Sequence, residues 1–71
     1  MVNVYTSLDC AYCEALLDWL DSLGVRYQQL PASKLKNLKT TPTTQIGDKF
    51  IPGFNRPALK RELKAAGLLG Y

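Results

Sequence analysis

An α/β fold, built from a mixed four-stranded sheet flanked by helices, is the class that the sequence predicts. Two observations carry this prediction. Segments with the two-residue period of strands alternate with segments of helical period, in the order β-α-β-(short α)-β-β-α. The chain has 71 residues, of which 46% are hydrophobic and 21% charged, as in an ordinary globular domain. Because this length suits one domain, we expect residues 1–71 to form a single domain.

A β-α-β unit is expected in the first half of the chain. Val2–Thr6 is rich in β-branched and aromatic residues, as buried strands are, and residues 25–30 alternate between apolar and polar up to Pro31. Between them, apolar residues recur at helical spacing from Ala11 until Gly24, a residue type that commonly ends helices. The members of this stripe are Tyr12, Leu16, Trp19, Leu20 and Leu23. This order predicts a parallel pair of strands with a right-handed crossover.

A hairpin is expected in the second half. Thr43–Ile46 and Lys49–Ile51 have the composition of strands, and Gly47-Asp48 between them suits a tight turn. Ahead of the hairpin, Leu35 and Leu38 are three residues apart, which suffices for a helix of one or two turns. The hairpin therefore adds an antiparallel half to the sheet, and the second helix is short.

The last helix carries signals at both ends. Asn55 can cap it by accepting a hydrogen bond from the backbone N–H of Ala58. Pro57 is tolerated in the first turn because its missing donor would be unpaired there anyway. Gly67 is expected to end the helix, and its buried stripe is predicted to be Leu59, Leu63 and Ala66.

The charge is unevenly distributed along the chain. The net charge of +3 divides into −4 for residues 1–25, which hold no base, and +7 for residues 26–71, where nine bases outnumber Asp48 and Glu62. Two interpretations are open: solvated helix faces, or a basic surface that attracts an anionic small molecule or an acidic protein. The bases lack the interleaved aromatic residues of single-strand binders, so we expect no nucleic-acid partner.

The apolar segments are short. No run approaches the roughly 20 residues of a membrane helix. The N-terminus has neither the basic nor the apolar region of a secretion signal. We therefore expect a cytoplasmic protein with no membrane partner.

The two cysteines, Cys10 and Cys13, are separated by two residues where the first strand gives way to the helix. A structural disulfide would close so short a loop that it stabilises by about 2 kcal/mol at best, and the cytosol would keep it reduced. Zinc needs four ligands, and with no histidine in the chain a closed site would require a dimer. Two unrelated buried cysteines are a third interpretation. Thiol–disulfide exchange is the one we favour, because the placement suits it.

The positions of the cysteines predict unequal roles. A thiolate at the start of the helix is stabilised by unpaired backbone N–H groups and by the helix dipole, so Cys10 is expected to attack the substrate disulfide. Cys13, in the first turn, is close enough to resolve the mixed disulfide that forms. Asp9 opposes this arrangement, because a neighbouring carboxylate disfavours a second negative charge.

Several segments together resemble the glutaredoxin family. Val4-Tyr5-Thr6 followed by Cys10-Ala11-Tyr12-Cys13 is similar to the start of a glutaredoxin, where the motif is usually Cys-Pro-Tyr-Cys. Thr40-Thr41-Pro42 is similar to the family's Thr-Val-Pro, and Ile51-Pro52-Gly53-Phe54 resembles its glycine turn before the last helix. The resemblance covers most of the chain, and three motifs in the family's order are a specific signal.

The resemblance implies a thioredoxin-like fold with a cis bond between Thr41 and Pro42, facing the cysteines. It also implies glutathione as co-substrate, with the backbone of Thr41 pairing with its cysteinyl part and Tyr12 flanking the same groove. The turn at Gly53 would receive the γ-glutamyl end. The glutathione-binding residues that it implies are Tyr12, Thr41, Pro42, Gly53, Phe54, Asn55 and Arg56.

Three features depart from the family. Ser7 stands where a lysine for the glycine carboxylate is common; Lys36 or Lys39 is a candidate substitute. Asn55-Arg56 replaces the family's Asp-Asp. Residues 53–57 are instead similar to the Gly-Phe-Arg-Pro of NrdH-redoxins. Those proteins take electrons from thioredoxin reductase and pass them to ribonucleotide reductase. The shortened second helix removes contact surface beside the groove.

The sequence therefore predicts a monomeric thiol–disulfide oxidoreductase that reduces protein disulfides or glutathione mixed disulfides. Glutathione is the expected reductant, and an NrdH-like use of thioredoxin reductase and ribonucleotide reductase is the alternative. A further alternative is a [2Fe–2S] cluster bridged between two subunits with glutathione, as in some glutaredoxins that lack the motif's proline, here replaced by Ala11. Otherwise we expect no metal. A non-catalytic adaptor remains the last alternative.

Overall fold

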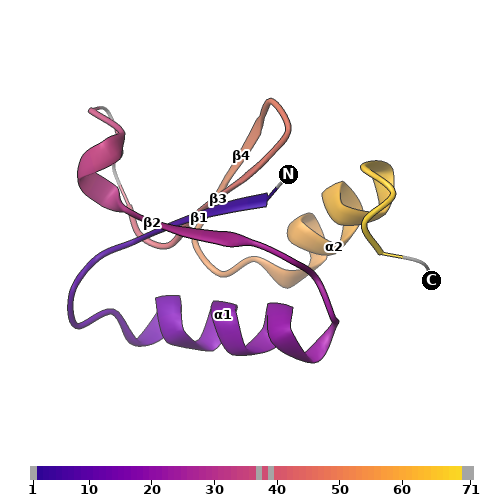
Figure 1. Ribbon diagram of the computed structural model, residues 1–71, viewed down its shortest axis with the longest axis horizontal. Helices are drawn as coiled ribbons and strands as arrows, with labels where there is room; N and C mark the ends of the chain where they lie inside the picture. Colours follow the sequence, from indigo (N-terminus) through magenta and orange to yellow (C-terminus); the bar gives the residue numbers. More distant parts are fainter. Residues whose placement is uncertain (1, 37, 39, 70–71) are drawn as a thin grey trace.

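The computed structural model describes residues 2–36, 38 and 40–69. Four strands, two α-helices and one short 3₁₀ helix follow the predicted order (Figure 1). Their bounds are β1 Val2–Thr6, α1 Ala11–Ser22, β2 Gln28–Pro31, η1 Ala32–Lys34, β3 Thr43–Ile46, β4 Lys49–Pro52 and α2 Arg56–Ala65. No described helix is long and apolar enough to span a membrane.

The strands form one mixed sheet in the order β2-β1-β3-β4. β1 runs parallel to β2 and antiparallel to β3, so Val4 lies between Gln29 on one side and Thr44 on the other. β3 and β4 form the predicted hairpin. The predicted fold class is confirmed: a strand–helix–strand unit supplies the parallel half of the sheet, and the hairpin supplies the antiparallel half.

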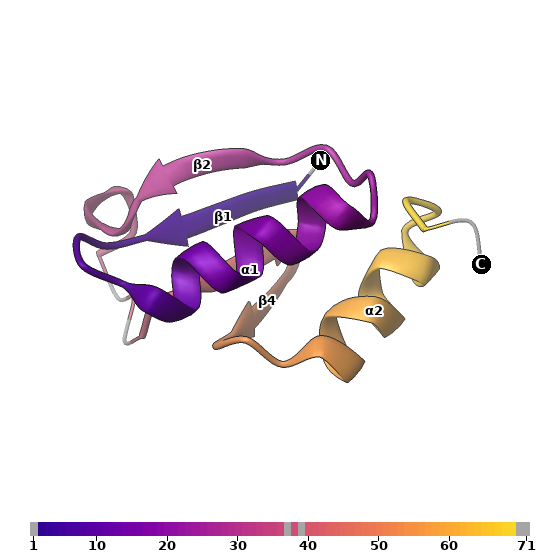
Figure 2. The ribbon, with the colours of Figure 1, turned by 90° about the horizontal axis from the view of Figure 1, so that it is seen from below.

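Both α-helices cover the same face of the sheet (Figure 2). α1 contributes Leu16 and Leu20 to the core, and α2 contributes Leu59 and Leu63; all four are completely buried. They pack with strand residues such as Val2, Val4 and Ile46 in one hydrophobic cluster. Each such side chain contributes about 1.5–3 kcal/mol by leaving water. This single apolar layer holds in place the ends of β1 and α1, where the cysteines lie.

Three details of the predicted elements are wrong. Tyr12 is 71% exposed, and the buried stripe of α1 begins at its neighbour Cys13. Ala66 is exposed at the end of α2, outside the buried stripe. β2 begins at Gln28, although Val25 is buried in the core. At these three positions the apolar pattern of the sequence does not coincide with the buried residues or with the bounds of the strand.

The short second helix also differs from the prediction. The helical turn is η1, which ends at Lys34, and Leu35 after it has an extended backbone with φ −117° and ψ 120°. Leu35 and Leu38 are half-buried instead of being stacked in a helix. Two leucines three residues apart do not define which residues form the turn, and Pro31 favours the N-terminal end of a helical turn. Lys39, a candidate ligand residue, lies outside the described residues.

The predicted helix ends are confirmed. The Asn55 side chain accepts a hydrogen bond from the Ala58 N–H at 3.2 Å, and Pro57 lies in the first turn of α2. Gly24 and Gly67 follow the two helices with φ of 71° and 73°, in the left-handed region that favours glycine.

Candidate redox site

Cys10 and Cys13 form a disulfide at the N-terminal end of α1. Their Cα atoms are 5.2 Å apart, within the usual range for such a bond. Cys10 is the N-cap of the helix, with an extended backbone, and its Sγ accepts a hydrogen bond from the Cys13 N–H at 3.1 Å. A cysteine in place of the usual Ser or Asp cap directs a helix N–H group at the sulfur, as stabilisation of a thiolate requires.

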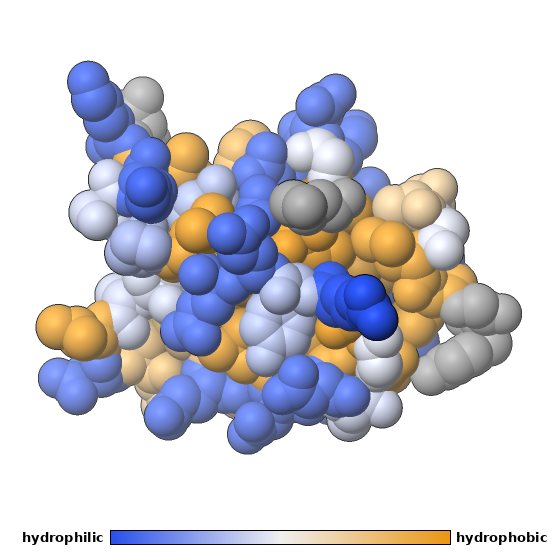
Figure 3. Space-filling view, viewed as in Figure 1, coloured by the Kyte–Doolittle hydropathy of each residue, from blue (hydrophilic) through white to orange (hydrophobic). Residues whose placement is uncertain are grey.

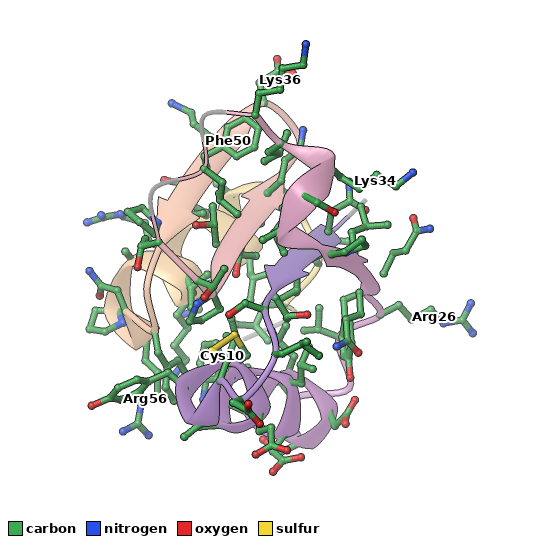
Figure 4. The ribbon with its side chains drawn as sticks, turned by 90° about the vertical axis from the view of Figure 1, so that its left-hand side faces the viewer. Cys10, Arg26, Lys34, Lys36, Phe50 and Arg56 are labelled. Atoms are coloured by element: carbon green, nitrogen blue, oxygen red, sulfur yellow. A yellow bond between two sulfur atoms is a disulfide. The ribbon has the colours of Figure 1, made fainter. Side chains whose placement is uncertain are left out.

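The two cysteines differ in exposure. Cys13 is 3% exposed and forms part of the buried side of α1, whereas Cys10 is half-buried at its tip. Figure 4 shows the disulfide above α1, on the side of the molecule that faces the viewer. An incoming disulfide can therefore approach the sulfur of Cys10 more readily than that of Cys13.

One cavity borders the disulfide on the β2 side. Its volume is about 500 Å³, and its lining includes both cysteines, Leu8, Asp9, Glu14 and Gln29. Leu8 is 94% exposed, and no pattern in the sequence points to it. Asp9 has a φ of 55°, in the left-handed region that aspartate tolerates better than most residues, and its side chain is exposed. The carboxylate that opposes the thiolate is thus surrounded by solvent.

A second cavity lies on the opposite side, at the loop before β3. Its volume is about 250 Å³, and five of the seven residues that the resemblance implied for glutathione line it: Tyr12, Thr41, Pro42, Gly53 and Phe54. We call it the cis-proline cavity, because the Thr41–Pro42 bond is cis, as the resemblance implied. The Gly53 N–H donates to the Pro42 carbonyl at 2.7 Å, which joins the two loops that form the cavity.

Arg56 and Asn55 lie beside this cavity and are not part of its lining. The Arg56 guanidinium is 5.4 Å from the centre of the Phe54 ring, a cation–π contact. Phe54 in turn meets Trp19 of α1 edge to face, with ring centres 5.9 Å apart. Asn55 uses its side-chain oxygen to cap α2. Arg56 therefore lies next to the cavity, on the same side of the molecule as Cys10 (Figure 4).

Ser7 has a partner that the sequence did not predict. Its Oγ lies 2.7 Å from Oγ1 of Thr41, so the loop before Cys10 is hydrogen-bonded to the cis-proline loop.

Lys36, the candidate for replacing the family's lysine, lines a different cavity, with Phe50. Within residues 2–36, 38 and 40–69, no three His, Cys, Asp or Glu residues are grouped as a metal site.

Comparisons with known proteins agree with this geometry. No family model and no curated protein matches the chain. Among solved structures, it is similar to the thioredoxin-like protein BC3987, with 25% identity over 89% of this chain and 100% of that one, at a TM-score of 0.78. A buckwheat glutaredoxin in complex with glutathione matches with 25% identity over 97% of this chain and 81% of its own chain, at a TM-score of 0.71. The NrdH-redoxin of Escherichia coli matches with 19% identity over 84% of this chain and 91% of its own chain, at a TM-score of 0.73.

Proposed function

This chain is a thiol–disulfide oxidoreductase with the glutaredoxin form of the thioredoxin fold, and we propose that glutathione is its reductant. In its reduced form it would convert a substrate disulfide into two thiols while its own two thiols become the Cys10–Cys13 disulfide. Two glutathione molecules would then reduce that disulfide and leave as glutathione disulfide. This chemistry would take place in the reducing cytoplasm, by a monomer.

The unequal exposure of the cysteines supports the order of the steps. The thiolate of Cys10, at the start of α1, attacks one sulfur of the substrate and expels the other as a thiol. Cys13, buried directly beneath it, then attacks Cys10 and releases the second thiol. The helix N-terminus stabilises the thiolate of Cys10 both before the first step and when it leaves in the reverse direction.

The cis-proline cavity is the observation that carries the choice of glutathione. Six described residues from three separate segments line it: Tyr12, Thr40, Thr41, Pro42, Gly53 and Phe54. One of them, Tyr12, stands between the two cysteines in the sequence. The backbone of Thr41 can pair with the cysteinyl unit of glutathione, and the turn at Gly53 can receive the γ-glutamyl end. Arg56, which contacts Phe54, would bind the γ-glutamyl carboxylate, where its planar fork favours a bidentate contact.

An NrdH-like function is the second candidate, and Arg56 is also the reason for it. The family's carboxylates are absent at Asn55-Arg56, and the Arg56–Phe54 contact belongs to the segment that is similar to NrdH-redoxins. An arginine that stacks on Phe54 without binding glutathione would leave thioredoxin reductase as the reductant and ribonucleotide reductase as a candidate substrate.

A pair of turnover assays on one disulfide substrate separates these candidates. One assay supplies glutathione and glutathione reductase, the other supplies thioredoxin reductase, and both follow NADPH consumption. We expect turnover in the first assay and little in the second; the reverse result would establish the NrdH-like function and refute ours. Anaerobic purification, with a visible spectrum of the pure protein, tests for the bridged iron–sulfur cluster in the same preparation.

A further inference from the structure

The face of the sheet opposite the two α-helices carries side chains of all four strands. By the register of the strands, Tyr5 of β1 lies between Leu30 and Thr43 on this face, and Thr43 lies beside Pro52. One step along the hairpin, Phe50 of β4 is 50% exposed. Among the described elements, only η1 and the segment after it flank this face (Figure 1).

A groove of about 430 Å³ lies on this face, between that segment and β4. Its walls are mostly apolar: Leu35 and Leu38 on one side, Phe50 and Pro52 on the other. Lys36 is the one charged residue in the described lining, and Figure 4 shows it beside Phe50 at one end of the molecule. In the space-filling view the molecule is hollowed between the segment after β2 and the hairpin (Figure 3). We call this the Phe50 groove.

The Phe50 groove adjoins the cis-proline cavity. Thr40 lines both of them. The Thr43 hydroxyl donates a hydrogen bond to the Thr40 carbonyl at 2.7 Å. This bond holds Thr40 in place between the Phe50 groove and the cis-proline cavity. Pro52 in the groove directly precedes Gly53 in the cavity, so the far walls are also adjacent. A peptide bound at Thr41 beside the disulfide can therefore continue past Thr40 into the groove.

We propose that the Phe50 groove binds the protein substrate, by receiving an apolar side chain that lies a few residues from the substrate's reactive cysteine. An acidic residue next to that side chain would meet Lys36. This inference rests on the proposed thiol–disulfide exchange and names its substrate class: a protein disulfide with an apolar and an acidic neighbour. Small disulfides have no residue for the groove, so Phe50 determines specificity without touching the reacting atoms.

Synthetic peptides that carry one cysteine as a mixed disulfide with thionitrobenzoate test the proposal. Attack by Cys10 on the peptide sulfur forms the peptide mixed disulfide and releases thionitrobenzoate, which is measured by its absorbance under single-turnover conditions. One peptide has only glycine and serine around its cysteine. The others carry a Leu-Glu pair placed two to five residues before or after it. We expect the best Leu-Glu peptide to react about tenfold faster at low concentration, or roughly 1.4 kcal/mol.

Three variants decide the outcome. Phe50→Ser should abolish the rate advantage of the Leu-Glu peptide and leave the rate of the glycine–serine peptide unchanged. Lys36→Gln should remove only the share of that rate advantage that requires the glutamate of the peptide and that weakens with added salt. Leu68→Ser, at an exposed apolar residue after α2, is the matched control and should change neither rate. An equal rate for all peptides, or a Phe50→Ser variant that slows both alike, would overturn the proposal. No release from any peptide would instead refute the proposed exchange reaction.

Discussion

The hydroxyl groups of Ser7 and Thr41 lie 2.7 Å apart, although the two residues are 34 positions apart in the sequence. The contact ties the loop before Cys10 to the loop with the cis proline, so it sets the width of the space between the nucleophile and the backbone that would bind substrate. Where glutaredoxins commonly carry a lysine for the ligand, this chain carries a residue that bonds to its own opposite wall.

Ser7→Ala should raise the KM for a small disulfide about threefold, because a loop no longer held at Thr41 must be ordered when substrate binds. Thr41→Val should have a similar effect, and the double variant little more than either alone. A net hydrogen bond contributes about 0.5–1.5 kcal/mol, so the coupling energy from the double-mutant cycle should fall in that range. Additive effects would show that the bond does not hold the two loops together.

Cys10→Ser should abolish all reductase activity, because no other thiol occupies the exposed end of α1. Cys13→Ser should lose the reduction of protein disulfides yet keep some turnover of glutathione mixed disulfides, which require only the nucleophile. NADPH-coupled assays with the two substrate classes measure both effects. If the two variants behave alike, the assignment of roles from exposure is wrong.

Arg56→Asp should raise the apparent KM for glutathione about tenfold, the factor that corresponds to roughly 1.4 kcal/mol. The expected cause is loss of the contact between the guanidinium and the γ-glutamyl carboxylate. Arg61→Asp makes the same change of charge on the exposed surface of α2 and serves as the control. Improved turnover with Arg56→Asp would mean that the arginine repels the ammonium of glutathione, and an unchanged KM would favour the NrdH-like function.

Thr44→Val should stabilise the protein by about 1 kcal/mol, because the Thr44 hydroxyl is completely buried and has no hydrogen-bond partner among the described residues. Its neighbour provides the matched control. The Thr43 hydroxyl is buried as well but donates to the Thr40 carbonyl, so Thr43→Val should destabilise by about the same amount. Urea unfolding at neutral pH measures both, and a destabilised Thr44→Val variant would contradict the prediction.

Tyr27 should make the free energy of unfolding depend on pH above about pH 10, the ordinary pKa of a tyrosine hydroxyl. Burial raises the pKa of its hydroxyl above the ordinary value of 10.0, and the Asp21 and Asp18 carboxylates raise it further. The folded protein therefore holds this proton more tightly than the unfolded chain. Its contribution is fully present below pH 10 and is lost as the pH rises from there through the pKa of the folded state. Tyr27→Phe should flatten this part of the curve of unfolding free energy against pH.

The local signals in the sequence were sufficient for most of the fold. The turn at Gly47-Asp48, the Asn55 cap and the glycines after both helices act within a few residues, and the structure has each of them where the pattern indicated. The spacing of Cys10 and Cys13 likewise predicts their joint position, because both belong to the first turn of one helix.

What the sequence could not give are contacts between distant segments. The helical stripe of α1 predicts which side of the helix is apolar, but it does not show that Tyr12 is exposed and lines the cis-proline cavity. The bond between Ser7 and Thr41, and the place of Thr40 between two cavities, depend on how three loops approach one another in space. Exposure of an apolar residue such as Leu8 has no local signature in the sequence at all.

The position of the disulfide also determines how the molecule responds to its own chemistry. The bond joins residues three apart, within a helical turn that already has backbone hydrogen bonds such as that from the Glu14 N–H to the Cys10 carbonyl. Opening it frees no distant strand or helix, since β1, β3, β4 and α2 share the apolar core and β2 pairs with β1. The oxidised and reduced proteins should therefore share one scaffold, and each turnover would exchange electrons without refolding any part of the chain.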